Sequence, residues 1–385
     1  MRKLRKLLIF VSLALFLTAC GNGTKPSGDT IKVGVNLELS GDVSVYGIPE
    51  RKGLELAVDE INAAGGVLGK QLELIFYDNA YDNAKAVENA IKLATQDEVV
   101  AMLGPATSAP SAAAAAIALQ YEVLLFTPSG TAESITLDGD KVNPYSFRAS
   151  FIDSFQGVVM ANFASNNLGN KKAAIMFNQS SEYSVGLKDS FTAKFVENGG
   201  EVVREISYVD KQKDFDSEIT KLEAADFDVL VLADYANPSA MILGKIRELG
   251  HDYPVVGPDG FETGDFNELA GGEENVYNVY FVNHFSPLLD NQKVKDFVTA
   301  FESKHNEGVN TFGALAYDTV YMLKEAIEKA DSTDPKAVRD ALKSITGFEG
   351  VTGTISFDDF NNPIKAAVMI ELRDGKQVAA DIVNP

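Results

Sequence analysis

The chain has 385 residues, a formal net charge of −21 and a single cysteine. Such an acidic chain does not attract nucleic acid or anionic lipid through its charge. One cysteine excludes a disulfide within the chain. Because a single hydrophobic core seldom serves more than about 250–300 residues, the length predicts two domains.

Residues 1–20 have the pattern of a secretory signal peptide. Four cationic residues within positions 2–6 precede an apolar run over residues 7–17, which is too short for an ordinary transmembrane span. The ending Leu17-Thr-Ala-Cys20 resembles a bacterial lipobox, in which Cys20 becomes a lipid-modified N-terminus. A conventional cleaved signal with an incidental cysteine is the alternative. Residues 21–29, rich in Gly, Asn, Thr, Pro and Ser, predict a flexible tether.

Strand-like and helix-like segments alternate from residue 31 onward. This order predicts parallel strands joined by helical crossovers, which is a doubly wound α/β layer. The order restarts after residue 150, and a helix followed by Gly-Gly and a strand occurs once in each half, at 62–66 and 197–200. The predicted strands are 31–37, 72–77, 99–103, 123–126, 173–177, 202–209, 229–233, 255–256, 276–282, 353–357 and 366–372. The predicted helices are 46–63, 85–95, 111–120, 155–165, 185–197, 215–225, 239–249, 293–304, 312–330 and 335–344.

The tail of the chain has too few elements for a third domain, so we expect it to complete the first two. This expectation gives two doubly wound lobes, one formed by residues 30–149 and 283–354, the other by residues 150–282 and 355–385. The chain then crosses between the lobes near residues 149, 283 and 354. Three crossings predict a hinge with restricted motion.

Signatures of catalysis are weak in this sequence. His251, His284 and His305 stand far apart without metal-ligand spacing, and the chain has no Gly-x-Ser-x-Gly nucleophile motif. The segment 65–70 lacks the spacing of a phosphate-binding loop, and the segment 78–82 lacks ligands that a calcium loop needs. The sequence therefore favours ligand binding over catalysis, with neither a metal nor a cofactor.

Small hydroxylated residues follow two neighbouring predicted strands. Ser108 comes after the strand 99–103, and Ser129 and Thr131 come after the strand 123–126. Backbone N–H groups and a helix N-terminus at such a turn favour an anion, so these residues are candidates for the carboxylate of a small ligand. The alternative is that they only cap helices, which is the commonest role of Ser and Thr there.

Aromatic and acidic residues lie just past other predicted strands. Tyr46 belongs to the first lobe, whereas Tyr183, Tyr235 and Asp259 belong to the second. Ligands of doubly wound sheets bind beyond the carboxyl ends of the strands. Hydroxyls, one carboxylate and several rings suit an α-amino acid zwitterion. Half-buried loop tyrosines and an ordinary Pro-Asp-Gly turn are the alternatives.

The chain resembles the leucine/isoleucine/valine-type substrate-binding proteins of ABC transporters, and the likeness covers everything after the tether. The N-terminus resembles the lipoprotein form found in Gram-positive bacteria. The segments that carry the likeness are 31–35, Ser40-Gly-Asp-Val-Ser-Val-Tyr-Gly47, 57–66, 103–105, Thr127-Pro-Ser-Gly-Thr131 and Val256-Gly-Pro-Asp-Gly260.

The resemblance implies a periplasmic binding protein type I fold and a role for each candidate residue. Ser108, Thr131 and the backbone of Ser129 match positions that receive the ligand's carboxylate and ammonium. Asp259 matches a position where branched-chain binders carry a glutamate, so its side chain is one methylene shorter. The aromatic positions around the ligand are matched by Tyr46, Tyr183, Tyr235 and Phe312.

The resemblance also implies what the protein does. We expect a monomer, anchored to the outer face of the cell membrane through lipid on Cys20, that closes on an amino acid and delivers it to ABC transporter permease subunits. A branched-chain amino acid is the first candidate for the ligand. A ligand-sensing subunit, and a binder of another amino acid, an amide, urea or an aromatic acid, are the alternatives.

Overall fold

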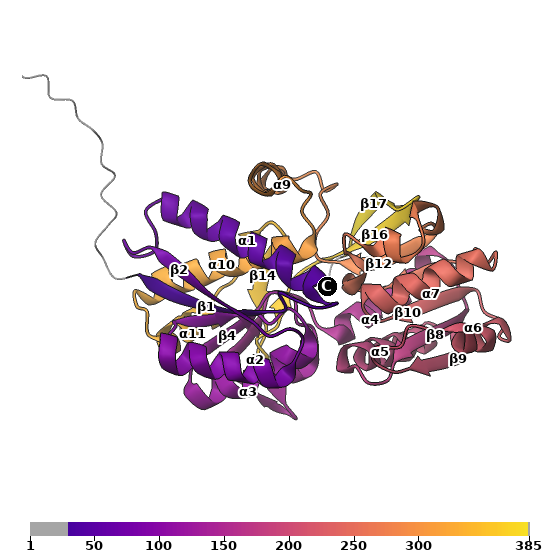
Figure 1. The fold of residues 1–385 in the computed structure, drawn as a ribbon, viewed down its shortest axis with the longest axis horizontal. Helices are drawn as coiled ribbons and strands as arrows, with labels where there is room; N and C mark the ends of the chain where they lie inside the picture. Colours follow the sequence, from indigo (N-terminus) through magenta and orange to yellow (C-terminus); the bar gives the residue numbers. More distant parts are fainter. Residues whose placement is uncertain (1–29, 384–385) are drawn as a thin grey trace, which may run out of the picture.

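The computed structural model describes residues 30–383 as two α/β lobes that lie side by side (Figure 1). The predicted signal peptide, the predicted lipidation site Cys20 and the predicted tether all lie outside the described residues. The two-lobed doubly wound architecture expected from the sequence is confirmed.

The first lobe is built on a five-stranded sheet with the strand order β2-β1-β3-β4-β7. All neighbouring strands pair in parallel, which requires the helical crossovers seen in the sequence. Both faces are covered, so the central strands are largely apolar. The strands are β1 (Ile31–Leu37), β2 (Leu72–Asp78), β3 (Ala101–Leu103), β4 (Leu124–Thr127) and β7 (Ser146–Arg148).

Two groups of helices cover this sheet. One face packs against α1 (Ser44–Ala63), α10 (Thr311–Ala330) and α11 (Pro335–Lys343), and the other against α2 (Asn83–Lys92) and α3 (Ser108–Tyr121). Helices α1 and α10 approach very closely, because a Cβ atom at Gly53 would lie 2.1 Å from the carbonyl oxygen of Gly313. This approach brings the first turns of α1 and α10 together at one end of the lobe.

The second lobe is built on a seven-stranded sheet with the order β17-β16-β12-β11-β10-β8-β9. The five strands β12, β11, β10, β8 and β9 are parallel, and β16 and β17 continue the sheet in antiparallel fashion. The strands are β8 (Lys172–Asn178), β9 (Glu201–Tyr208), β10 (Val229–Ala233), β11 (Val255–Gly257), β12 (Val279–Asn283), β16 (Ala367–Arg373) and β17 (Lys376–Val383).

Helices again cover both faces of the second sheet. One hydrophobic cluster joins it to α4 (Asp153–Asn162) and α5 (Glu182–Glu197). Another joins it to α6 (Asp216–Glu223), α7 (Ala236–Glu248) and the short α8 (Phe266–Leu269). Among residues 30–383, no helix has the length and apolar character needed to cross a membrane.

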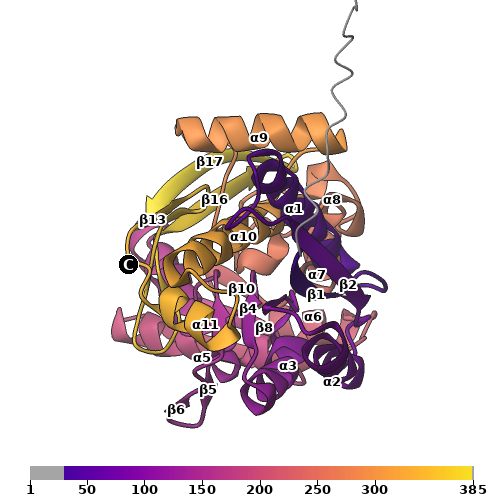
Figure 2. The same cartoon turned by 90° about the vertical axis from the view of Figure 1, so that its left-hand side faces the viewer.

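One further helix and a small three-stranded sheet pack on the first lobe. Helix α9 (Gln292–His305) crosses over α1 at a steep angle in both views (Figures 1 and 2), where Phe297 and Phe301 pack with Leu56. Phe357 places its ring 5.4 Å from that of Phe147. The small elements are the sheet β13 (Phe348–Gly350), β14 (Gly353–Phe357) and β15 (Pro363–Ile364), the hairpin β5 (Leu137–Asp138) and β6 (Lys141–Val142), the π-helical turns Leu93–Asp97 and Phe163–Asn167, and the 3-10 turns Glu133–Ile135, Asp259–Phe261 and Glu273–Asn275.

The structure corrects several expectations about the elements. The prediction that two strands close the chain was wrong, because β17 is a further strand and β14 belongs to a separate small sheet. β14 packs against the first lobe, so the chain passes to the second sheet between Ile364 and Ala367, later than the boundary predicted at 354. Helix α3 begins at Ser108 rather than at 111, since nothing in the small residues 108–110 opposes a first helical turn.

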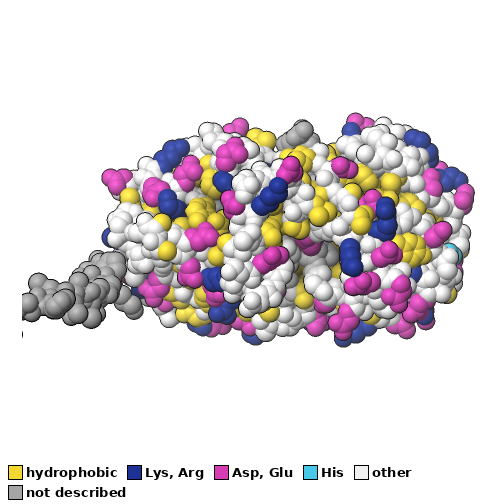
Figure 3. All heavy atoms as spheres, turned by 90° about the horizontal axis from the view of Figure 1, so that it is seen from above, with side chains coloured by type: hydrophobic (Ala, Val, Ile, Leu, Met, Phe, Trp, Pro, Cys, Tyr) yellow, Lys and Arg dark blue, Asp and Glu magenta, His cyan; other side chains and the backbone are white. Residues whose placement is uncertain are grey.

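Charged side chains of both signs cover the surface. On the face seen in Figure 3, acidic side chains are spread over both lobes with basic side chains between them.

Candidate ligand-binding site

All eight residues predicted from the sequence line one enclosed cavity between the lobes. In this closed arrangement the lining side chains leave little free space between them, and Ala106, Thr107 and Gly260 also line the cavity. Seven of the eight are buried, and Tyr235 is partly buried. The eight are Tyr46, Ser108, Ser129, Thr131, Tyr183, Tyr235, Asp259 and Phe312. The lobes must therefore move apart to admit a ligand.

The fold brings these residues together because each stands at the carboxyl end of a strand or in the first turn of a helix. Ser108 begins α3, and Ser129 and Thr131 follow β4. Asp259 follows β11, directly after Gly257 and Pro258. In parallel sheets these ends lie on one edge, so two facing lobes present two such edges to one cleft.

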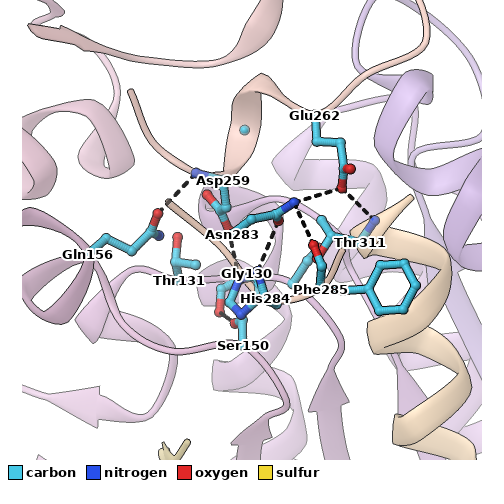
Figure 4. A network of polar contacts seen from close by, with 12 residues as sticks. Gly130, Thr131, Ser150, Gln156, Asp259, Glu262, Asn283, His284, Phe285 and Thr311 are labelled. Atoms are coloured by element: carbon cyan, nitrogen blue, oxygen red, sulfur yellow. Dashed lines mark hydrogen bonds and ion pairs between the residues drawn. The ribbon is translucent and has the colours of Figure 1, made fainter. Parts of the chain in front are cut away.

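The second lobe holds the carboxyl group of Asp259 through both of its oxygens, and Figure 4 shows the side of the group that faces His284. The hydroxyl of Tyr183 donates to Oδ1 at 2.7 Å, and Nε2 of His284 lies 3.0 Å from Oδ2. The N–H of Asp259 donates to Oε1 of Gln156 at 3.1 Å, so the backbone is held as well. Asp259 is 3% exposed, so its carboxyl group is buried beside the cavity.

In the first lobe, the hydroxyls of Ser108 and Thr131 lie 3.4 Å apart at the start of α3. Ser108 Oγ accepts from the N–H of Ala132 at 3.2 Å and from that of Thr131 at 3.4 Å. These long hydrogen bonds leave the two hydroxyls and the Thr131 N–H close enough together to serve one anion. The positive end of the helix dipole adds to this preference.

Ser129 differs from its neighbours because its hydroxyl turns into the lobe. Its Oγ contacts the carboxyl of Glu50 and lies 2.7 Å from the carbonyl oxygen of Ala106. Burial raises the pKa of Glu50 well above its usual range, and the nearby Glu38 raises it further. Both hydrogen-bonding partners of the Ser129 hydroxyl, the Glu50 carboxyl and the Ala106 carbonyl, lie inside the lobe. The side chain of Ser129 is thus committed, and its backbone is the part that remains for a ligand.

Glu38 corrects the expectation of free backbone N–H groups at the first of these turns. Its buried carboxyl accepts from the N–H of Ala106 at 2.9 Å and from that of Thr107 at 3.2 Å, and it also contacts the Thr107 hydroxyl. These donors are therefore taken by the protein. The partners are 68 and 69 residues apart in the chain, so no local pattern indicated them.

Arg148 is a further residue that the sequence reasoning missed. It is fully buried, and its guanidinium donates to the carbonyl oxygens of Gly130 at 3.1 Å and Ala132 at 2.7 Å. Burial lowers its pKa to about 10, so it stays protonated at neutral pH. Arg148 therefore fixes the turn that carries Thr131. The hydroxyl of Ser150 stabilises the same turn by donating to the carbonyl oxygen of Gly130 at 2.9 Å.

The two lobes are in contact across the cavity through Tyr46. Its hydroxyl accepts from the N–H of Ala236 at 3.0 Å, at the start of α7 in the second lobe. Its ring lies 4.9 Å from that of Phe312 and 5.4 Å from that of Tyr235, which stacks on Tyr183 at 4.6 Å. The four rings thus enclose the cavity from both lobes.

A wider and more open cavity lies beside the enclosed one and shares Tyr46 and Tyr235 with it. Its lining contains neither Ser108, Thr131 nor Asp259. The smaller cavity is the one that brings together all eight residues predicted from the sequence. Within residues 30–383, the structure has no grouping of His, Cys, Asp and Glu side chains suited to a metal ion.

Residues 30–377 match the protein family described as periplasmic binding protein. The chain belongs to this family. The membership expected from the sequence is thereby confirmed, and the family is extracytoplasmic. As a periplasmic binding protein, the chain is of a solute-binding type.

Curated relatives and solved structures agree with this assignment. The leucine-, isoleucine-, valine-, threonine- and alanine-binding protein of Pseudomonas aeruginosa is 31% identical over 334 residues, which are 86% of this chain and 87% of that protein. The branched-chain amino acid transporter substrate-binding protein LivJ of Streptococcus pneumoniae, solved with isoleucine, is 39% identical with a TM-score of 0.87 and covers 93% of this chain and 100% of its own. The leucine-binding protein LivK of Thermotoga maritima is 29% identical with a TM-score of 0.86 and covers 92% and 99%.

Proposed function

We propose that this periplasmic binding protein captures one branched-chain amino acid, Leu, Ile or Val, and delivers it to the permease of an ABC transporter. The observation that carries the proposal is the enclosed cavity in which Ser108 and Thr131 of one lobe face Asp259 of the other. The printed functions of the Pseudomonas relative and of the isoleucine-bound Streptococcus protein support the same ligand class.

In this proposal the ligand's carboxylate binds the first lobe. Ser108 Oγ and the Thr131 N–H, which contact one another at 3.4 Å, would each turn to a carboxylate oxygen. The start of α3 adds the favourable dipole. Charge-assisted hydrogen bonds of this kind contribute about 1.5–3 kcal/mol each.

The ligand's ammonium would lie on the opposite side, against Asp259. A carboxylate has about four acceptor positions, and Tyr183 and His284 use two of those on Asp259. The remaining positions are available to an ammonium. The carbonyl oxygen of Ser129 and the Thr131 hydroxyl would complete its hydrogen bonds from the first lobe.

The aliphatic side chain would then lie among Tyr46, Tyr235 and Phe312. Burial of one Leu or Ile side chain contributes about 1.5–3 kcal/mol, which is about as much as a single charge-assisted hydrogen bond. Because the ligand's carboxylate and ammonium together make several such bonds, these two groups determine most of the affinity. The size and shape of the aromatic wall set the preference among side chains.

Capture would proceed by closure of the lobes. An open form binds the carboxylate on the first lobe, and the second lobe then brings Asp259, Tyr183 and Tyr235 over the ligand. The contacts of Tyr46 with Gly260 and Ala236 are bonds that only a closed arrangement makes. We further propose that the protein is a monomer held at the outer face of the membrane by lipid on Cys20.

A thermal-shift screen over the twenty amino acids and short amides, followed by calorimetry, tests the ligand class. Because a ligand that binds only the folded state stabilises it, Leu, Ile and Val should raise the melting temperature most. Urea, benzoate and acetamide serve as controls for the alternative ligand classes. A larger shift with any of these than with all three branched-chain amino acids would contradict the proposal, and failure to recover a permease by affinity capture from membranes would contradict the transport role.

A further inference from the structure

One buried imidazole touches the acidic residue of the cavity without lining the cavity itself. His284 is 1% exposed, and its Nε2 lies 3.0 Å from Oδ2 of Asp259. The second oxygen of the same carboxylate accepts from Tyr183 at 2.7 Å. Asp259 is therefore held between two side chains that come from different elements of the second lobe.

The position of His284 is itself fixed by its neighbours (Figure 4). Its ring stacks on Phe151, with 3.6 Å between the ring centroids. Its backbone N–H donates to Oδ1 of Asn283 at 2.9 Å, and the amide of Asn283 donates to Glu262 at 2.9 Å and to the carbonyl oxygen of Phe285 at 3.0 Å. The stacking thus fixes the plane of the imidazole ring, and the hydrogen bonds fix the backbone that carries it.

The protonation state of His284 determines what it offers to Asp259. Burial lowers the pKa of His284 to about 4 and outweighs the contact with Asp259, which raises it, so the neutral ring is favoured at pH 7. A neutral imidazole has one N–H, and only Nε2 faces a carboxylate. Nδ1 has no hydrogen-bond partner among residues 30–383, which agrees with the proton residing on Nε2.

We propose that His284 is a positioning residue for ligand binding, which together with Tyr183 holds the Asp259 carboxylate in the one orientation that faces the cavity. The proposal rests on the proposed function, in which Asp259 receives the ligand's ammonium. Without fixed hydrogen-bond partners, an aspartate side chain rotates about two torsions. A buried carboxylate can then also turn to donors of the protein instead of the ligand. The hydrogen bond from His284 prevents both the rotation and the alternative bonding before the ligand binds.

A double-mutant cycle with leucine tests this role. Calorimetry compares His284→Ala in the wild-type background and in the Asp259→Ala background, with thermal melts to check folding. We expect His284→Ala to weaken leucine binding about tenfold in the wild-type background and less than about twofold once the carboxylate is gone. His284→Gln, which keeps an N–H donor, should remain within about threefold of the wild type.

The matched control is His251→Ala, because His251 also pairs with a carboxyl group, that of Glu223 at 3.1 Å, far from the cavity. An equal loss from His284→Ala in both backgrounds would make the residue merely structural and would overturn the inference, as would no loss at all. If His284→Ala does not fold, a His284→Gln variant as weak as Asp259→Ala would overturn it. Wild-type protein that binds no amino acid would overturn the proposed function itself, which is a different result.

Discussion

The hydroxyl of Tyr46, in the first turn of α1, donates a hydrogen bond to the carbonyl oxygen of Gly260 in the second lobe at 2.9 Å. The same oxygen of Tyr46 accepts from the N–H of Ala236, so one side chain of the first lobe joins two loops of the second. Gly260 follows Asp259 directly. The bond that closes the lobes and the carboxylate proposed to hold the ligand are therefore adjacent in the chain.

Tyr46→Phe should weaken ligand binding while it keeps an aromatic ring at this position of the cavity lining. The substitution keeps the ring beside Phe312 but removes both interlobe hydrogen bonds, each of which contributes about 0.5–1.5 kcal/mol. We expect a loss of roughly tenfold in leucine affinity, seen mainly as faster dissociation in stopped-flow measurements. Tyr121→Phe, at an exposed position on α3, is the control and should change nothing. Unchanged dissociation in Tyr46→Phe would show that these bonds do not contribute to closure.

Asp259→Ala and Thr131→Ala should each weaken amino-acid binding about tenfold or more, on the order of 1.4 kcal/mol. The first removes the anion that pairs with the ammonium, and the second removes a hydroxyl from the opposite lobe. Calorimetry measures both, with Asp381→Ala on the exposed part of β17 as a control for loss of one negative charge. Normal binding by either variant would exclude that residue from the site.

Ser108→Ala and Ser129→Ala should have opposite signatures. The hydroxyl of Ser108 faces Thr131, so its loss should lower ligand affinity about tenfold. Because the bonds that it accepts from the N–H groups of Thr131 and Ala132 are long, its loss should cost less stability than the loss of the Ser129 hydroxyl. The hydroxyl of Ser129 is bonded inside the lobe, and its loss leaves the buried carboxyl of Glu50 without this partner. We expect that variant to lose about 1–3 kcal/mol of stability while affinity changes less than about threefold. Denaturant titration measures the stability of both variants, and calorimetry measures their affinity. A reversed pattern would refute the assignment of the two hydroxyls.

Lys365 should make stability depend on pH between about 7 and 10. It is buried with its Nζ 2.7 Å from Thr352 Oγ1, and burial lowers its pKa from 10.5 to about 7. In this window the unfolded chain binds a proton that the folded protein does not, so stability rises with pH, by at most about 1.4 kcal/mol per unit.

Urea denaturation at pH 7.5 and 9.5 measures this effect as the difference between the wild type and Lys365→Met. The variant should lack the rise, and Lys376→Met, at an exposed position of β17, should retain it. A wild type and a Lys365→Met variant with parallel pH profiles would mean that Lys365 keeps its proton when folded.

Seven of the eight residues around the cavity were predictable from their positions in the chain topology, whereas Phe312 was implied only by the family resemblance. Alternating strands and helices produce parallel sheets, and parallel sheets collect the residues after each strand on one edge. Ser108, Thr131 and Asp259 each follow a strand, so their convergence needs no knowledge of side-chain packing. The register and length of the terminal strands were harder, since β17 pairs antiparallel at the edge of the sheet and has few buried positions to mark it.

The sequence by itself determined the two doubly wound lobes, the family and the eight residues that line the cavity. Only the tertiary structure decided how the polar groups behind them are used. Glu38 takes the N–H groups of one turn, Glu50 takes the hydroxyl of Ser129, and His284 contacts Asp259 across 25 residues of chain. Buried polar groups must find hydrogen-bond partners, and those partners are chosen by which segments meet in space, which no spacing along the chain records.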